Sequence, residues 1–245
     1  MAAGRAEKKM IKEVGVYMDV KEAAQAGQDL IESIRRNDYM IGLEMSSQVR
    51  AAADGLREQL GNALQLLAAD LYASETHFLL ELIQNADDNN YPQGGVPTVR
   101  IELATDQLVF FNNELGFTER NVRALCGVGR STKAKDKKSG FIGEKGIGFK
   151  SVFQVSERPE IHSNGFHFFF DMSKHDELLG YVVPNWKLPS VETEASGTTI
   201  ILPAKPARAF TVDLFAQLHP KLMLFLRRLR RMELKTEARW MTYWG

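Results

Sequence analysis

Hydrophobic positions follow a helical period through the first third of the chain. Residues 21–36 predict one helix, with Leu30, Ile31 and Ile34 at helical spacing. A longer run with the same period predicts a helix over 46–71. A third helix is predicted from His77 to about Asn89. Its apolar arc consists of Phe78, Leu79, Leu82, Ile83 and Ala86.

Short β-prone runs dominate the middle of the chain. The runs 97–104 and 107–112 flank Thr105-Asp106 and predict a hairpin, and the runs 160–163 and 166–172 flank Asn164-Gly165, the strongest hairpin signal in the sequence. Further strands are predicted over 181–183, 198–202 and from 232 to 234. Further helices are predicted from Thr118 to about Cys126, with Thr118 as N-cap, and over 149–155 and 210–231.

The order of these elements indicates the fold class. Three helices come first, and hairpins interrupted by further helices follow, which differs from the regular alternation of βαβ units. The pattern therefore favours an α+β fold, a two-layer sandwich with helices on one face of a mostly antiparallel, mixed sheet.

Composition narrows the classes of function. The 245 residues are 44% hydrophobic with a formal net charge of zero, which suits one domain or slightly more and gives no electrostatic support for binding nucleic acid or a membrane. Cys126 is the only cysteine, so no disulfide framework exists, and we interpret it as a packed or loop thiol. The first ten residues have no apolar signal segment, which points to an intracellular protein, cytoplasmic or nuclear.

The third predicted helix carries a second, polar arc beside its apolar one. Glu81 and Asn85 are four residues apart, and Asn85 and Asp88 are three apart, so all three share one helix edge. Such a set can activate a water and ligate a hard cation, although it is also typical of an ordinary solvated edge. We expect Glu81 to have no cationic neighbour within one helical turn and so to be free to act as a base.

Glycines gather just before the predicted helix over 149–155. Gly140, Gly143, Gly146 and Gly148 would let backbone N–H groups approach a phosphate at a helix N-terminus, with Lys145 and Lys150 adding charge. The run lacks the GKS or GKT of a Walker loop and the βαβ frame of a Rossmann fingerprint, and glycines before helices are often only turns. The Lys-rich stretch 127–140 before it predicts a mobile loop.

Taken together and in order, four motifs resemble the Bergerat-fold ATPases, the superfamily of gyrase, heat-shock-ninety chaperones, histidine kinases and mismatch-repair ATPases, and most of all its sacsin and NO VEIN type modules. They are LYASETHFLLELIQNADD (71–88), FNNELGFTERNV (111–122), GFIGEKGIGFKSVF (140–153) and SGTTIIL (196–202), with GVGRSTK (127–133) similar to the start of a lid. The resemblance implies a nucleotide-binding domain over 44–204, between a flexible lead-in (1–20) with a helical extension (21–43) and a C-terminal helix with the start of a missing transducer segment (205–245).

The resemblance also implies roles for individual residues. Glu81 would orient or deprotonate the attacking water, Asn85 would coordinate Mg²⁺ bound to ATP or ADP, and Asp88 would lie at the rim or fix the helix. The remaining implied nucleotide contacts are Arg130, Lys133, Gly143, Gly146, Ile147, Gly148, Phe149 and Thr198. One departure concerns the superfamily aspartate that binds adenine, because that position falls here on Asn112 or Asn113, and the first glycine of the motif becomes Glu114.

Three functions follow from this resemblance. The first is a slow, chaperone-like ATPase whose lid closure drives conformational change or association, with a nucleotide-dependent homodimer or a protein client as partner. The second is a non-hydrolysing, nucleotide-gated interaction module, and the third is a pseudo-site kept as a scaffold. In the C-terminal run PKLMLFLRRLRRMELK (220–235), we expect arginines lying along a helix surface, with a nuclear-import or acidic-partner patch as the alternative.

Overall fold

A computed structural model describes residues 8–11, 16–71, 77–127, 148–173, 178–189, 196–216 and 218–245. Its α-helices are α1 (Val20–Ser33), α2 (Ser47–Leu71), α3 (His77–Asp87), α4 (Glu119–Leu125) and α5 (Asp213–Ala216). A π-helical turn, η1 (Ile34–Asp38), extends α1, and the 3₁₀-helices are η3 (Gly148–Gln154), η4 (Leu178–Tyr181) and η5 (Pro220–Phe225). The strands are β1 (Lys8–Ile11), β2 (Val16–Asp19), β3 (Thr98–Leu103), β4 (Gln107–Asn112), β5 (Glu160–Ser163), β6 (Phe166–Phe169), β7 (Asn185–Trp186), β8 (Thr198–Pro203), β9 (Arg231–Thr236) and β10 (Trp240–Trp244).

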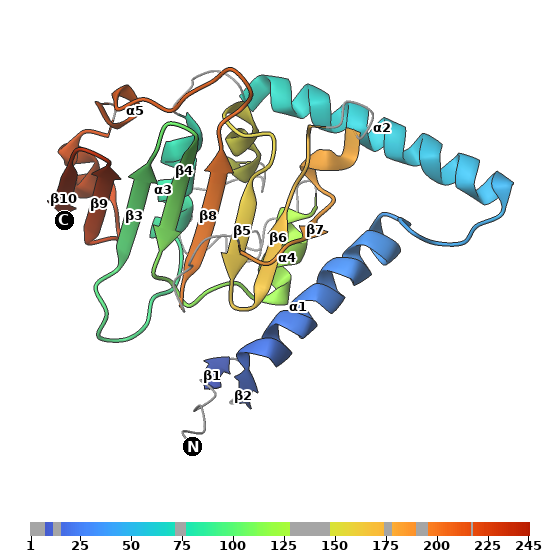
Figure 1. Ribbon diagram of the computed structural model, residues 1–245, viewed down its shortest axis with the longest axis horizontal. Coiled ribbons are helices and arrows are strands. Elements are labelled where there is room, and N and C mark those ends of the chain that lie inside the picture. Colours follow the sequence, from blue (N-terminus) through green and yellow to red (C-terminus); the bar gives the residue numbers. More distant parts are fainter. Residues whose placement is uncertain are drawn as a thin grey trace.

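Eight of the strands form one twisted sheet in the order β10-β9-β3-β4-β8-β5-β6-β7 (Figure 1). All neighbours in this sheet are antiparallel except β3 and β9, which run parallel. The predicted mixed, mostly antiparallel sheet of an α+β fold is therefore confirmed. The parallel pair arises because the chain returns from β8 to the opposite side of β3 before it forms β9.

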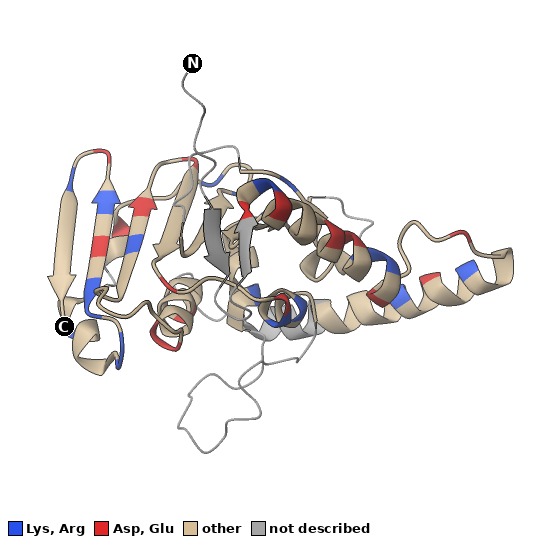
Figure 2. Cartoon of the chain, turned by 90° about the horizontal axis from the view of Figure 1, so that it is seen from below, with Lys and Arg blue, Asp and Glu red and all other residues tan. Residues whose placement is uncertain are grey.

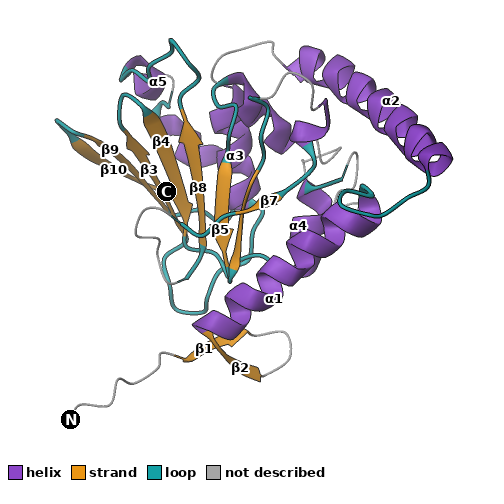
Figure 3. Ribbon diagram, turned by 45° about the vertical axis from the view of Figure 1, so that its right-hand side comes forward, coloured by secondary structure: helices purple, strands orange, loops and turns teal. Residues whose placement is uncertain are grey.

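The apolar arc of α3 packs against one face of this sheet. Phe78, Leu79, Leu82, Ile83 and Ala86 are all buried, as the helical period predicts. They share one core with the inward positions of β3, β4 and β8, which are Val99, Ile101, Leu108, Phe110, Ile200 and Leu202. Helices α3 and α4 lie on the same side of the sheet, behind it in Figure 1 and beside it in Figure 3. This layer fixes the direction in which the polar edge of α3 points.

Helix α1 docks at the other end of the sheet, against β6 and β7. Asn164 and Gly165, between β5 and β6, have φ of 51° and 83°, so they form the turn that their sequence predicts. A Cβ added at Gly27 of α1 would overlap the carbonyl of Gly165, so the helix approaches the turn through a position without a side chain. This turn also supports the loop that follows β4, because Asn164 Nδ2 donates to the carbonyl oxygens of Leu115 and Phe117 at 3.0 and 3.1 Å.

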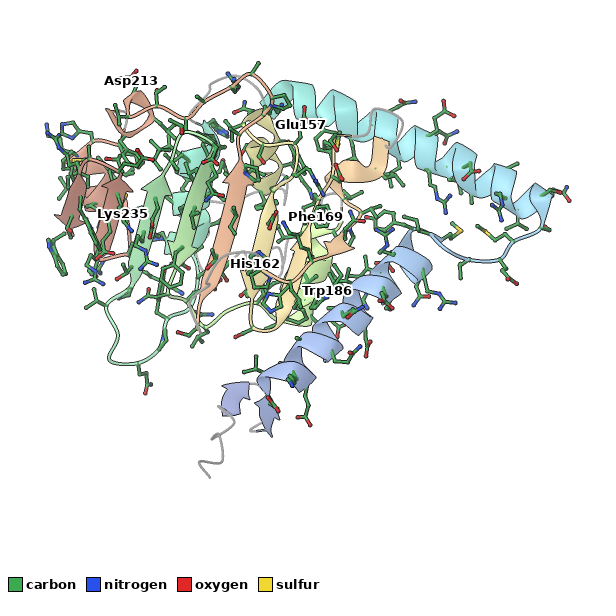
Figure 4. All side chains as sticks on the ribbon, in the orientation of Figure 1. Glu157, His162, Phe169, Trp186, Asp213 and Lys235 are labelled. Carbon is green, nitrogen blue, oxygen red and sulfur yellow. The ribbon has the colours of Figure 1, made fainter. Side chains whose placement is uncertain are left out.

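Charged and polar side chains lie on the other face of the sheet at its two ends. At one end, charges of both signs alternate along β3 and β9 (Figure 2), and Lys235 Nζ lies 2.9 Å from Glu102 Oε2. At the other end, His167 of β6 lies between His162 of β5 and Trp186 of β7, both labelled in Figure 4, with ring centroids 5.3 and 5.7 Å away. The Nδ1 atoms of His162 and His167 are 3.2 Å apart. Burial alone would raise the pKa of Glu160 beside His162, but hydrogen bonds and positive charge from His162 and Lys187 outweigh that effect and hold the pKa below its ordinary value.

Several predicted elements differ from the structure. The strand predicted over 181–183 is wrong, because Tyr181 ends η4 and the next strand, β7, begins at Asn185. The helix predicted over 149–155 is a 3₁₀-helix, η3. Within 1–20, expected as a flexible lead-in, β1 and β2 pair as an antiparallel hairpin.

The long helix predicted over 210–231 is also wrong. The structure has only α5 and η5 in this region, and it describes 226–230 without helix. Pro220 occupies the first position of η5, after the cap residue His219. Proline cannot continue a preceding helix, so a helix that passes through this position is excluded. Leu226 then adopts an extended conformation, and the chain enters β9.

Candidate functional site

Glu81 and Asn85 lie one turn apart on the polar edge of α3. The Glu81 side chain is about one quarter exposed, and its Oε1 lies 3.5 Å from Nε2 of His77, one turn earlier. The expectation that Glu81 has no cationic neighbour is therefore wrong whenever His77 is protonated. Histidine was overlooked as a neighbour because it is uncharged in its neutral form.

The glycine motif meets Glu81 at its last member. A Cβ added at Gly148 would overlap Oε2 of Glu81. The carboxylate thus lies directly against the backbone at the start of η3, where the motif ends. Two sequence motifs more than sixty residues apart therefore meet, with the carboxylate of one touching the glycine of the other.

Asn85 fits a Mg²⁺ ion that is mainly held by phosphates. Its side chain is half-buried, and within the described part of the chain no hydrogen bond is recorded for its amide. Magnesium in nucleotide sites keeps several waters and takes only one or two protein oxygens. One amide oxygen beside Glu81 matches that requirement, and among the described residues no cluster of three or more His, Cys, Asp or Glu could hold a metal by itself.

The end of α3 is joined to the C-terminal segment by two aspartates. Asp87 accepts hydrogen bonds from the backbone N–H groups of Arg227, Arg228 and Leu229 at 2.8, 2.8 and 2.9 Å. Asp88 forms an ion pair with Arg227 at 2.7 Å, which is a contact of the kind expected for a residue that fixes the helix. The arginines expected along a helix surface instead anchor an extended segment to α3.

A row of polar residues closes the end of the sheet beside α3. In the strand register, Thr198 of β8 lies opposite both Asn112 of β4 and Ser163 of β5. Asn112 is buried; its Nδ2 donates to the Tyr91 hydroxyl at 2.7 Å and to the Thr98 carbonyl at 3.2 Å. Its Oδ1 accepts from Asn89 at 3.3 Å. Asn112 therefore connects the end of β4 to the loop after α3.

Asn113 serves the start of β3. Its Oδ1 accepts from the backbone N–H of Thr98 at 2.7 Å, and its Nδ2 donates to the carbonyl of Val96 at 2.9 Å. Both asparagines predicted as adenine contacts are thus used in bonds within the protein.

Glu114, the next residue, is buried at 6% exposure. Its Oε1 accepts a hydrogen bond from Thr198 Oγ1 at 2.6 Å. Thr198 Oγ1 lies 2.7 Å from Ser163 Oγ, which accepts from the backbone N–H of Phe117 at 2.8 Å. A hydrogen-bonded chain therefore leads from Phe117 through two hydroxyls to a carboxylate.

Three known proteins are similar to this chain in amino-acid sequence. The chain is 45% identical to Protein NO VEIN of Arabidopsis thaliana over 220 residues, 82% of this chain. It is 28% identical to sacsin of Homo sapiens over 185 residues, 70% of this chain, and 28% identical to the chaperone protein HtpG of Sulfurovum sp. over 130 residues, 43% of this chain. No protein-family model matches the chain.

The chain is a module of the sacsin and NO VEIN type, related to the Bergerat-fold ATPases. The module spans 8% of the NO VEIN protein, 4% of sacsin and 21% of the HtpG chaperone. The relation to HtpG and sacsin makes it an ATPase-like or chaperone-related module. In its described residues, no helix combines the length and apolar character needed to cross a membrane.

Two residues at the end of the glycine motif have side chains buried within the protein. Lys150, expected to add charge there, is buried, with Nζ donating to the carbonyls of Leu125 and Tyr181 at 2.6 and 2.5 Å. Burial without a carboxylate partner lowers its pKa to about 8. Phe149 is also buried and packs against Phe170, with ring centroids 6.3 Å apart. Lys150 therefore joins η3 to its neighbours, which corrects that expectation.

The remaining predicted contacts of the module, Arg130, Lys133, Gly143, Gly146 and Ile147, and the predicted lid over 127–140 beyond Gly127, lie outside the described residues. Asp87, Glu114, Ser163 and Tyr91 were missed by sequence reasoning. No local pattern marks them, because each is defined by a partner 21 to 142 residues away in the chain. Only Glu114 carried a signal, as a charged residue at the place of a motif glycine.

Proposed function

We propose that this module binds an adenine nucleotide with Mg²⁺ and hydrolyses ATP slowly, and that lid closure over the nucleotide drives conformational change or association. The observation that carries the proposal is the contact between the Glu81 carboxylate and the backbone at Gly148. A carboxylate at the end of a glycine motif can reach a water beside a phosphate held by that motif. The relation to HtpG supports nucleotide as the ligand.

The proposed step is a water attack on the terminal phosphorus of ATP. Glu81 accepts a proton from the water, an oxygen–phosphorus bond forms, and the bond to the bridging oxygen of ADP breaks, which gives ADP and phosphate. Asn85 would hold Mg²⁺, which supplies charge neutralisation for the phosphates when bound.

The test compares Glu81→Ala and Asn85→Ala with the wild-type module. Glu81→Ala should keep ATP affinity with Mg²⁺ and lower phosphate release by roughly 10²-fold or more, as expected for loss of a general base. Asn85→Ala should weaken nucleotide binding only when Mg²⁺ is present, because the cation loses an oxygen ligand. Isothermal titration with and without Mg²⁺ and steady-state phosphate release measure both effects.

The alternative is a nucleotide-gated module that does not hydrolyse ATP. The proximity of His77 to Glu81 favours it, because a protonated imidazole would compete for the carboxylate. Glu81→Ala turning over ATP as fast as wild type, with intact binding, would select this alternative. Loss of nucleotide binding in Glu81→Ala would remove the catalytic role altogether. We also propose an intracellular protein client or a second copy of the module as the partner that nucleotide regulates.

A further inference from the structure

The two edges of the eight-stranded sheet differ in how they are protected. At one edge, β7 has only two residues, and helix α1 lies against it. At the other edge, β10 has five residues and, in the described part of the chain, pairs only with β9 (Figure 1). Another strand can add to an open edge, and proteins prevent this with short edge strands, charges, proline or a covering element. The edge at β7 has such protection, whereas β10 contains neither a charged residue nor a proline.

The backbone bonds between β10 and β9 show which groups of β10 point away from the sheet. At the two ends of the pair, the carbonyl of Arg239 accepts from Thr236 at 2.8 Å, and the N–H of Gly245 donates to the carbonyl of Arg230 at 3.0 Å. Backbone groups alternate sides along an antiparallel strand, so the odd-numbered residues of β10 face β9. The even-numbered residues, which face outward, are Trp240, Thr242 and Trp244. None of the described residues hydrogen-bonds to their backbone N–H and C=O groups.

The same three residues carry exposed side chains. Trp240 and Trp244 are 60% and 64% exposed, and Thr242 between them is exposed as well. Lys235 Nζ lies 5.6 Å from the centre of the Trp240 ring, and the guanidinium carbon of Arg231 lies 5.6 Å from the centre of the Trp244 ring. These cation–π contacts order both rings while most of their surface remains exposed.

Helix η5 enlarges the apolar surface at this edge. It contacts β10 and carries Leu224 and Phe225, which at 78% and 80% are the most exposed large hydrophobic side chains of the described residues. Exposed apolar side chains that gather in one place mark protein interaction sites. The β10 edge therefore offers unpaired backbone groups and apolar area together.

The sequence of β10, WMTYW (240–244), is complementary to itself. Its centre is Thr242, and both ends are tryptophan. In an antiparallel pair of two such strands about a two-fold axis at Thr242, Trp240 lies opposite Trp244 of the second copy, and Thr242 lies opposite Thr242. Every outward N–H then meets an outward C=O. Aromatic pairs and threonine pairs are also among the favourable cross-strand neighbours.

The charges beside β10 do not oppose this pairing. Arg231 lies 3.4 Å from Glu233, and Lys235 lies 2.9 Å from Glu102. Because a carboxylate balances each of these cations, two copies can approach each other without net repulsion at this edge.

We propose that β10 pairs with β10 of a second copy of this module in an isologous dimer, which joins the two sheets into one across a two-fold axis. This inference goes beyond the proposed nucleotide function and does not depend on it, because the pairing groups are present without nucleotide. The interface is small, so we expect a dissociation constant on the order of 10 μM.

Sedimentation velocity without nucleotide, from about tenfold below to tenfold above that concentration, measures the association. Thr242→Pro removes an outward N–H, and it leaves the bonds to β9 intact because proline is tolerated where the N–H points out of the sheet. It should weaken the association by about tenfold or more. Thr242→Val is the matched control, because it keeps the N–H and suits a strand, so it should associate like the wild type.

Exchange of charges at position 242 tests the register, because this position faces itself in the proposed dimer. Thr242→Lys and Thr242→Glu should each remain monomeric alone, since like charges then lie directly opposite, whereas an equimolar mixture of the two should associate. Within one copy, Glu233 of β9 lies opposite position 242, and Arg231 and Lys235 lie diagonally across from it, so either charge has an opposite neighbour. Thermal unfolding checks that each variant is folded.

Three outcomes would overturn the inference. The first is a wild type that stays monomeric throughout, which would leave the β10 edge to a strand of a different protein and would leave the nucleotide function untouched. The second is undiminished association of folded Thr242→Pro, which would place the contact on another surface. The third is a mixture of Thr242→Lys and Thr242→Glu that associates no more than either variant alone, which would exclude pairing about Thr242.

Discussion

At Gly148 the absence of a side chain decides where the Glu81 carboxylate can lie. A Gly148→Ala methyl group would overlap Oε2 of Glu81, which must then move away from the start of η3. If Glu81 positions the water, a displacement of about 1 Å should reduce turnover by roughly 10²-fold with little change in the free energy of unfolding. Steady-state phosphate release and thermal unfolding measure the two quantities.

Gly55 in α2 supplies the matched control for this substitution. An added Cβ there meets no atom within 4 Å, and the residue lies inside a helix. Gly55→Ala should raise the free energy of unfolding by about 0.5–1 kcal/mol and leave turnover unchanged, because alanine loses less conformational entropy in a helix than glycine does. Equal turnover in Gly148→Ala and Gly55→Ala would mean that Glu81 is not positioned by this contact.

The residues whose positions were predicted correctly from sequence are those whose placement follows from local spacing. Glu81 and Asn85 were predicted because a helix of known period puts them on one edge, and the apolar arc beside them is buried as expected. Glu114 and Ser163 were missed because they meet Thr198 only after β4, β5 and β8 pair in the sheet. Sequence spacing gives no access to such a register between distant strands.

At the scale of elements, Asp87 couples α3 to the strand pair β9–β10. Its carboxylate receives three consecutive backbone N–H groups just before β9 begins. Asp87→Ala would leave these donors without their charged acceptor, so it should lower the free energy of unfolding by about 3 kcal/mol or more. Chemical denaturation measures this loss, and hydrogen exchange should show faster exchange in β9 than in β5.

Asp88 supplies the matched control for the three hydrogen bonds to Asp87. Asp88→Asn removes the charge of a carboxylate whose side chain is 8% exposed but keeps an oxygen that can accept from Arg227, so it should cost less than Asp87→Ala, which removes the acceptor of three backbone donors. A loss as large as that of Asp87→Ala would show that the ion pair, rather than the backbone bonds, holds the segment.

The hydrogen bonds to Asp87 also explain why the predicted C-terminal helix was wrong. Residues 222–231 are rich in leucine and arginine, which are good helix formers in isolation. Here the backbone N–H groups that a helix would use internally are donated to Asp87 instead. A contact across about 140 residues thus overrides local propensity, whereas α1, α2, α3 and α4 matched prediction because their periods and caps are local.

The predicted lid over 127–140 remains a prediction of the sequence. Its Lys-rich composition between two nucleotide motifs suggests that trypsin should cut near residues 133–138 and that saturating ATP should slow this cleavage. Gel analysis of a proteolysis time course, with nucleotide-free and ATP-saturated samples, gives the measurement. Cleavage at the same rate in both samples would remove the assignment.

At the scale of the whole molecule, two buried groups at the junction of α4 and η3 make stability depend on alkaline pH in opposite directions. Burial lowers the pKa of Lys150 to about 8 from its ordinary value of 10.5, and burial raises the pKa of the Cys126 thiol to about 12 from 9.0. From pH 8 to 10.5 the unfolded chain holds a lysine proton that the folded protein lacks, so the free energy of unfolding rises. From pH 9 the folded protein keeps a thiol proton that the unfolded chain loses, so the free energy falls.

The wild-type module should therefore gain stability between about pH 8 and 9 and change little from pH 9 to 10. Cys126→Ala removes the opposing group, so its free energy of unfolding should continue to rise up to pH 10 by as much as about 1.4 kcal/mol per pH unit. Above pH 10, burial of Tyr91, which raises its pKa, opposes that rise. Lys150→Met should show a smaller rise from pH 8 to 9, because only Lys205, whose pKa burial also lowers, still contributes to it, whatever its absolute stability after two carbonyls lose their donor. Denaturant titrations at successive pH values measure these slopes, and a flat profile in Cys126→Ala would show that Lys150 keeps its proton in the folded protein.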